Sequence, residues 1–194
     1  MKETFIKQYW KAYGGWVALF RSPYMWIAFI VSLMNYQFSQ NENWIDTPLA
    51  ILPNLLGFTL GGYSIWLALG NTSLNEILAE KERDEDIPSE FMVVNASFVH
   101  FIFLQVLCLF LLIFIKTTVL KETIIFSIWG CYSPVVSSVL GLANFFNWFT
   151  FFLFLYSILS MLGALFALLN IASVLDILYR HSAEKKHQEK KDNE

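Results

Sequence analysis

Apolar residues along this chain occur in long runs, and the charged residues gather between the runs. Segments 22–41, 47–75 and 91–115 contain no charged residue and are 20, 29 and 25 residues long. A helix that crosses the hydrocarbon core of a bilayer needs about 20 mostly apolar residues, because lipid offers its backbone amides no other hydrogen-bonding partner. Each of the three runs therefore predicts one transmembrane helix.

A fourth uncharged run, 123–175, is 53 residues long and has room for one span or two. Lys and Arg are enriched in cytoplasmic segments, so their positions distinguish these alternatives. With four spans and the N-terminus inside, 11 of the 13 Lys and Arg residues are cytoplasmic, whereas a fifth span would export the five that follow Leu175. We therefore expect an all-α, polytopic four-helix membrane domain with both termini in the cytoplasm.

The predicted membrane domain covers 22–175 and lies between an N-terminal segment, 1–21, and a C-terminal tail, 176–194. Its four spans are expected at about 22–41, 48–70, 91–115 and 145–175. Segment 116–143 joins the last two spans. Its part 124–142 is apolar but interrupted by Ser, Gly and Pro. That part is interpreted either as lying on the outer face or as re-entering the membrane, where irregular backbone must be covered by protein or water.

The N-terminal segment 1–21 places aromatic residues three or four positions apart, with lysines between them. This spacing is typical of an amphipathic helix lying along the inner membrane surface. An ordinary helical lead-in to the first span is the alternative, and Gly14 with Gly15 interrupts either one. The aromatic residues are Phe5, Tyr9, Tyr13, Trp16 and Phe20.

The composition agrees with a membrane domain and offers little catalytic chemistry. Hydrophobic residues make up 56% of the chain, charged residues 15%, and the mean hydropathy is +0.51, which is too apolar for an ordinary soluble domain. The sequence contains no GxSxG, HExxH or glycine-rich phosphate loop. Its two cysteines match neither a disulfide framework nor a zinc site. We therefore expect no enzyme, cofactor or metal site; a lipid-modifying enzyme would need an unrecognised set of polar residues.

The second span differs from the others in its helix-breaking and small residues. Pro53 removes one backbone hydrogen bond, Asn54 brings an amide into the apolar region, and Gly57, Gly61 and Gly62 form a GxxxG motif with one extra glycine. Small residues one turn apart allow a neighbouring backbone to come close. The span is interpreted as a helix-packing surface, within one subunit or between subunits, with a pore-lining or hinge helix as the alternative.

The fourth span repeats this small-residue pattern on two adjacent faces. Ser160 lies one helical spacing from Ala164, and Gly163 lies the same spacing from Ala167. These faces could pack against the second span or against its copy in another subunit. A homo-oligomer is therefore expected, with a stoichiometry that the pattern leaves open.

The third span contains three polar residues in an otherwise apolar helix, Asn95, His100 and Gln105. Polar side chains at membrane depth are costly, so each is expected to face protein or water. His100 lacks the carboxylate or second ligand expected of a proton relay or metal site. It is interpreted as an interhelical hydrogen-bonding residue, and a pore lined by Asn54, His100 and Gln105 is the alternative.

The expected cytoplasmic segments carry most of the charge. Loop 71–90 contains seven acids against Lys81 and Arg83, a net charge of −5, while the tail 176–194, which we interpret as a basic tail, is polar and carries five Lys and Arg residues beside five acids. Acids gain nothing from an anionic leaflet, so the loop is interpreted as a docking surface for a soluble protein. A solvated surface without a partner is the alternative, and the tail's lysines could serve only to fix the topology. The docking candidates are Glu80, Glu82, Asp84, Glu85 and Asp86.

The layout resembles the membrane subunit of the bacterial Kiwa anti-phage defence system. The resemblance rests on the chain length, the four-span arrangement, the segment LPNLLGFTLGGYSIWLALGN at 52–71 and the lack of a catalytic motif. It implies an inner-membrane sensor of phage infection that oligomerises and holds a DNA-binding effector in the cytoplasm, with no direct contact between this chain and nucleic acid. The sequence thus favours a membrane scaffold or sensor over a small homo-oligomeric channel or membrane-permeabilising effector.

Overall fold

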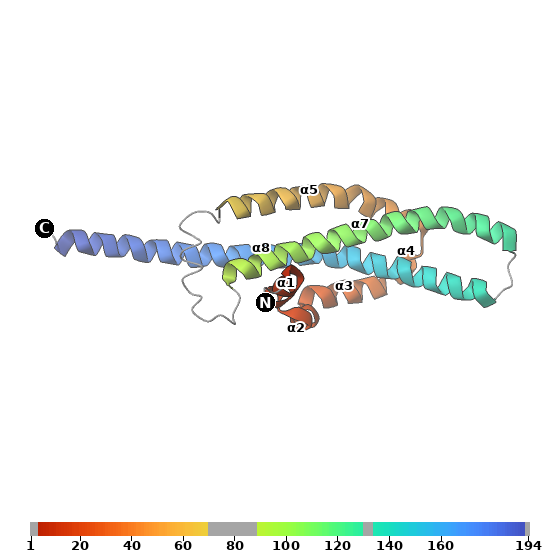
Figure 1. Cartoon of the computed structure of the whole chain (residues 1–194), viewed down its shortest axis with the longest axis horizontal. Coiled ribbons are helices and arrows are strands. Elements are labelled where there is room, and N and C mark those ends of the chain that lie inside the picture. The colour runs from red at the N-terminus through yellow and green to blue at the C-terminus, as the bar shows by residue number, and fades with distance from the viewer. Residues whose placement is uncertain (1–3, 70–88, 130–133, 193–194) are drawn as a thin grey trace.

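The computed structural model describes residues 4–69, 89–129 and 134–192, which form helices and turns without a strand. Five short helical elements precede and join the first long helix, and two very long helices follow it (Figure 1). The elements are α1 (Phe5–Tyr13), α2 (Gly15–Arg21), α3 (Pro23–Met34), α4 (Tyr36–Ser39), the 3₁₀ helix η1 (Glu42–Ile45), α5 (Asp46–Leu69), α7 (Glu90–Trp129) and α8 (Pro134–Asp192).

Helix α7 lies at the centre of the bundle and packs against α8 on one side and α5 on the other (Figure 1). The core is formed where their apolar faces meet. Leu52 of α5 and Cys108 and Leu112 of α7 are fully buried there, with Phe154 of α8 beside them. Trp66 Nε1 of α5 also donates to Asn95 Oδ1 of α7 at 3.0 Å, so an indole satisfies one polar residue of the third span.

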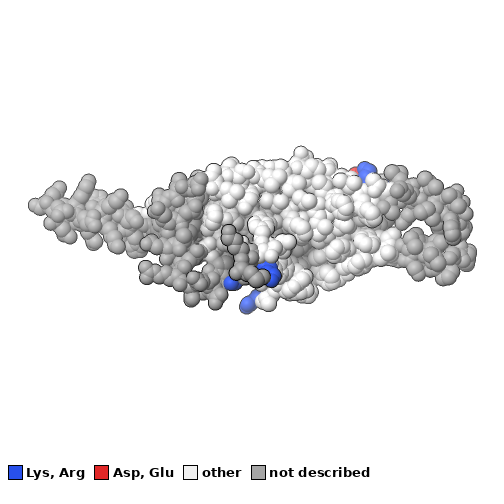
Figure 2. All heavy atoms as spheres, viewed as in Figure 1, with Lys and Arg blue, Asp and Glu red and all other residues white. Residues whose placement is uncertain are grey.

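Large apolar side chains also cover the outside of the bundle. Phe58 on α5 is 73% exposed and Phe110 on α7 is 65% exposed. Figure 2 shows a broad white surface over the described part of one face, with Lys, Arg, Asp or Glu atoms only near its lower and upper right edges. An apolar surface of this extent is stable in contact with hydrocarbon rather than with water.

Three stretches of helix are long and apolar enough to cross a membrane, at Asn43–Ala68, Phe91–Thr117 and Gly141–Asn170. They match the predicted spans at 48–70, 91–115 and 145–175. A fourth is counted only if α2 and α3, which meet at a bend of 54°, form one span. The expected class, a helical membrane protein with several spans, is therefore supported.

The region of the predicted first span, 22–41, consists of two helices rather than one. Helix α3 begins with Pro23 at its first turn, where the missing amide hydrogen costs nothing. It ends at Asn35, whose side chain donates to the Val31 carbonyl at 2.9 Å, and α4 follows. With 12 residues, α3 is about 18 Å long, shorter than the hydrocarbon core of about 30 Å.

Both long helices continue beyond their apolar spans. Helix α7 has 40 residues and α8 has 59, which correspond to about 60 Å and 88 Å. Together they occupy segment 116–143 except for 130–133. The described backbone of this segment is therefore helical, whereas its Ser, Gly and Pro residues suggested irregular backbone. Its place on the outer face or in the membrane stays a prediction. Loop residues 70–88 lie outside the described part of the chain.

Candidate functional site

A histidine and three tyrosines from three helices meet inside the bundle, and we call them the His100 cluster. His100 of α7 is 6% exposed. The Tyr9 hydroxyl of α1 lies 2.8 Å from its Nδ1, and the Tyr156 hydroxyl of α8 lies 3.1 Å from its Nε2. Both ring nitrogens are therefore hydrogen-bonded, each to a different helix.

Tyr13, one turn after Tyr9, completes the cluster. Its ring stacks on the imidazole of His100, with centroids 4.0 Å apart and planes inclined by 20°. Its hydroxyl lies 3.4 Å from that of Tyr156. Helix α1 is thus held by two residues one turn apart, which contact α7 and α8 together.

The hydrogen bonds of the cluster form one continuous chain, Tyr9–His100–Tyr156–Tyr13. A neutral imidazole donates from one nitrogen and accepts at the other, so its tautomer sets the direction of the chain. Burial, together with the neighbouring Tyr13, raises the pKa of Tyr9 to about 12, and its hydroxyl therefore stays protonated at physiological pH. Within the described residues, no group of three or more His, Cys, Asp or Glu could hold a metal ion. The arrangement attaches α1 to α7 and α8.

A two-glycine turn brings α1 to this position. Gly14 has φ +94° and Gly15 has φ +64°, and the Gly14 amide donates to the Lys11 carbonyl at 3.1 Å to end α1. A Cβ on Gly14 would lie 2.8 Å from that of Ala18, which is closer than real contacts allow. Positive φ and this close approach both favour glycine. The turn explains why the aromatic residues at 1–21 do not form one helical face.

An apolar cavity of about 700 Å³ adjoins the cluster, and we call it the α1 cavity. Residues of α1, α2 and α3 line it on one side, and residues of α7 and α8 line it on the other. Trp10 and Trp16, whose rings meet edge to face with centroids 5.0 Å apart, are both among its lining residues. His100 and Tyr156 also line it, so the hydrogen-bonded cluster forms part of its wall.

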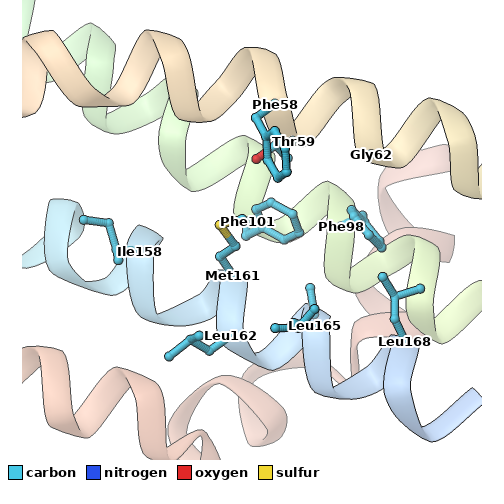
Figure 3. A pocket seen from close by; sticks show the side chains of 11 residues that line it. Phe58, Thr59, Gly62, Phe98, Phe101, Ile158, Met161, Leu162, Leu165 and Leu168 are labelled. Carbon is cyan, nitrogen blue, oxygen red and sulfur yellow. The ribbon is translucent and has the colours of Figure 1, made fainter.

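A second, smaller cavity of about 320 Å³ lies between α5, α7 and α8 (Figure 3). Phe58 and Thr59 reach it from α5, and Phe98 and Phe101 reach it from α7. Apart from the hydroxyl of Thr59, its labelled side chains are apolar or sulfur-containing. It is a packing gap between three spans, without a hydrogen-bonded cluster of its own.

The small residues expected to pack together have different surroundings. A Cβ on Gly57, Gly61 or Gly62 would meet nothing within 4 Å, whereas one on Gly163 would lie 3.1 Å from Cε2 of Tyr24 on α3. Ala164 is buried with Phe98 and Phe101 of α7. Ser160 donates to the Ser157 carbonyl of its own helix at 2.9 Å. The side chain of Ala167 lies outside the described residues.

The residues considered as a pore or hinge do not share one lining in a single chain. Helix α5 continues through Pro53, and Asn54 is exposed and donates to the Ala50 carbonyl of the same helix at 3.0 Å. His100 belongs to the cluster. Gln105 is fully buried, and its amide has no hydrogen-bond partner among the described residues.

The five acids proposed for partner docking, from Glu80 to Asp86, lie outside the described residues. Tyr156 was not singled out by the sequence. The available signal was a phenol in the middle of an apolar span, because a buried tyrosine hydroxyl usually finds a hydrogen-bond partner.

No protein-family model, curated protein or solved structure matches this chain.

Proposed function

We propose that this protein is a membrane scaffold and sensor that self-associates in the bilayer and holds a soluble protein in the cytoplasm. The observation that carries the proposal is the continuity of α8. The helix runs without interruption from the membrane bundle to Asp192, about 33 Å beyond the end of the last apolar span at Asn170. A change in packing within the membrane can thus reach the tail through one helix.

Within the bundle, α8 contacts the elements whose packing a sensor would change. Helix α8 packs against both α3 and α7, and Tyr156 joins it to the His100 cluster. Its outward part carries an exposed ion pair between Asp176 and Arg180 at 2.9 Å, a spacing that supports a solvated helix by a few tenths of a kcal/mol, roughly 0.3–0.5. These features support α8 as the link between the bundle and a cytoplasmic partner.

The proposal includes four crossings, with both termini on the cytoplasmic side. Helix α1 contacts His100, whereas Asp46 pairs with Lys116 at 2.9 Å, and 16 residues of α7, or about 24 Å, separate His100 from Lys116. The chain between α1 and α5 therefore connects two levels of the bundle nearly a bilayer core apart. This supports α3 and its neighbours as the fourth crossing, despite the shortness of α3.

Self-association is supported by the open face of α5. A Cβ on Gly57 or Gly61 would meet nothing within 4 Å, and Asn54 is exposed one turn from Gly57, whereas Gly62 lines the second cavity between the helices (Figure 3). An amide facing lipid is costly, and small residues allow close approach of another helix. A second copy packed on this face would shield the Asn54 amide from lipid and fill the space beside the glycines.

The resemblance to the Kiwa membrane subunit suggests the setting: anti-phage defence at the bacterial inner membrane, with a DNA-binding effector as the soluble partner. The loop at 71–90 and the tail at 176–194 are the proposed contact segments because they are the most charged parts of the chain.

Affinity purification of the tagged protein from its native host in mild detergent, followed by native mass measurement, tests the proposal. We expect a homo-oligomer carrying a stoichiometric soluble protein. Reversing Glu82, Asp84, Glu85 and Asp86 to Lys should release that protein, and the matched Gln and Asn variants should release less of it. An oligomer that never retains a soluble protein would contradict the proposal.

A homo-oligomeric channel is the second candidate, and the exposed position of Asn54 on α5 favours it, since several copies could direct this amide into a shared pore. Ion flux into liposomes that contain the purified protein alone distinguishes the two functions. Flux that disappears in an Asn54→Leu variant of unchanged oligomeric mass would replace the scaffold with a channel.

A further inference from the structure

We propose that the α1 cavity binds one acyl chain of a phospholipid from the surrounding leaflet, with α1 and α2 closing over the chain. This site lies outside the proposed scaffold role and does not depend on a soluble partner. The proposal rests on the chemistry of the walls, on the depth of the cavity and on the helices that enclose it.

The walls are suited to hydrocarbon. The lining residues include no charged side chain, and most are aliphatic or aromatic. The polar side-chain atoms among them belong to Tyr9, His100 and Tyr156, which hydrogen-bond to one another, and to the indole N–H groups of Trp10 and Trp16. A polar ligand would therefore lose its hydration and find, at most, these two indole donors in return. A volume of about 700 Å³ is that of an ordinary ligand site, for which the usual range is about 300–1,000 Å³.

The depth of the cavity points to a membrane lipid as the source. His100 lies about 24 Å along α7 from Lys116, whose ion pair with Asp46 belongs at one surface of the bilayer. Because the hydrocarbon core is about 30 Å thick, the end of the cavity at His100 lies roughly one helical turn inside the other surface, and its wall continues along α7 to Leu107. Lys7 of α1, two residues before the cavity-lining Tyr9, is exposed, and a lysine near a membrane surface attracts lipid phosphate.

Two neighbouring residues of α8 distinguish the inner wall of this partly open cavity from general contact with the bilayer. Leu153 of α8 is only 5% exposed, yet it lines the cavity. Phe154, the next residue, is 8% exposed but does not line it. Lipid that merely surrounds the bundle has little access to either side chain. An acyl chain inside the cavity would touch Leu153 but not Phe154.

Filling the cavity tests the proposal with a matched pair of variants on one helix. Val99 lines the cavity, while Val106 on α7 lines neither cavity and is 48% exposed. Native mass spectrometry of protein extracted from phospholipid membranes should show one retained phospholipid per chain in the unchanged protein. Val99→Phe should weaken that retention about tenfold, which corresponds to about 1.4 kcal/mol, and Val106→Phe should leave it unchanged. Equal retention in both variants would overturn the proposal.

Labelling of the unchanged protein provides a test that does not depend on the folding of a variant. A phospholipid with a photoreactive group near the end of one acyl chain is incorporated into liposomes with the protein, illuminated, and located by peptide sequencing. We expect label at Leu153 and Trp10, and none at Phe154. Label confined to exposed positions such as Phe110 would mean annular lipid only, and cross-links to a second copy at the cavity would identify a protein occupant; both outcomes overturn the proposal.

Discussion

The hydroxyl of Tyr9 lies 2.8 Å from Nδ1 of His100, although 91 positions separate the two residues along the chain. Through this contact and the stacking of Tyr13 on the same imidazole, the first described helix becomes part of the bundle. The N-terminal helix thus joins α7 to α8 at the level of the α1 cavity.

Tyr9→Phe should loosen α1 without disturbing the spans. Removing one partner of a buried neutral hydrogen bond costs about 1 kcal/mol, and His100 Nδ1 would lose its partner. We expect faster trypsin cleavage at Lys7 and a lower free energy of unfolding in detergent. The matched control is Tyr36→Phe, which removes an exposed hydroxyl from α4 and should change neither. Equal cleavage rates in both variants would show that the Tyr9 contact does not hold α1.

Gly14→Ala should disrupt the turn between α1 and α2. The substitution places a Cβ at φ +94° and 2.8 Å from the Cβ of Ala18, and the left-handed conformation alone costs about 1–2 kcal/mol. Protease sensitivity of α1 should therefore rise, as for Tyr9→Phe. Gly141→Ala is the control, because a Cβ there meets nothing within 4 Å inside a helix, where alanine is favoured over glycine.

Gly61→Leu should reduce oligomer mass while leaving the fold of the subunit intact. A Cβ on Gly61 meets nothing within 4 Å among the described residues, and the rest of the Leu side chain would separate this face of α5 from a second copy. Gly163→Leu gives the opposite pattern, because Tyr24 lies 3.1 Å from the Cβ position and the subunit itself would lose stability. Native mass measurement and thermal unfolding distinguish the two effects. An unchanged oligomer mass in Gly61→Leu would exclude this face as the interface.

Single cysteines test the proposed topology. On a Cys131→Ser background, Lys7→Cys and Asp192→Cys should react with a membrane-impermeant maleimide from the cytoplasmic side, and Lys116→Cys from the opposite side. Cys108 is fully buried and should remain silent. Labelling of Lys7→Cys from the same side as Lys116→Cys would indicate three crossings.

High pH should release α1 through ionisation of Tyr9. Burial raises the pKa of Tyr9 from 10.0 to about 12, so its contribution to stability is complete below pH 10 and is lost as the pH rises through about 12. The difference in tyrosinate absorbance between the unchanged protein and Tyr9→Phe should therefore show a titration well above pH 10. A titration at the ordinary value of 10 would mean that Tyr9 is not buried.

The three long spans were predictable because hydropathy is a property of each segment alone. The run between Glu90 and Lys116 must lie in lipid or protein whatever its neighbours are. The first span was harder to predict, because its uncharged length gave no sign that the helix would end at Asn35.

Pairings between helices could not be predicted from one sequence. Gly163 and the glycines around Gly61 belong to similar small-residue patterns, yet only Gly163 has a close neighbour, which is a tyrosine of α3. The His100 cluster was hidden for the same reason. A polar histidine in a span indicates that a partner exists, but the turn at Gly14 and Gly15 decides that the partner comes from α1.

The length of α8 beyond the membrane makes it a lever arm. About 33 Å of helix follow Asn170, so a tilt of roughly 10° where the helix leaves the bilayer would displace its far end by about 6 Å. Pivoting about Asn170, the same tilt would move the segment around Tyr156, 14 residues or about 21 Å before it, by about 4 Å. In the proposed scaffold role, a shift of α8 near α1 would thus reach Asp192 enlarged by about half, as a displacement of the surface to which a partner docks.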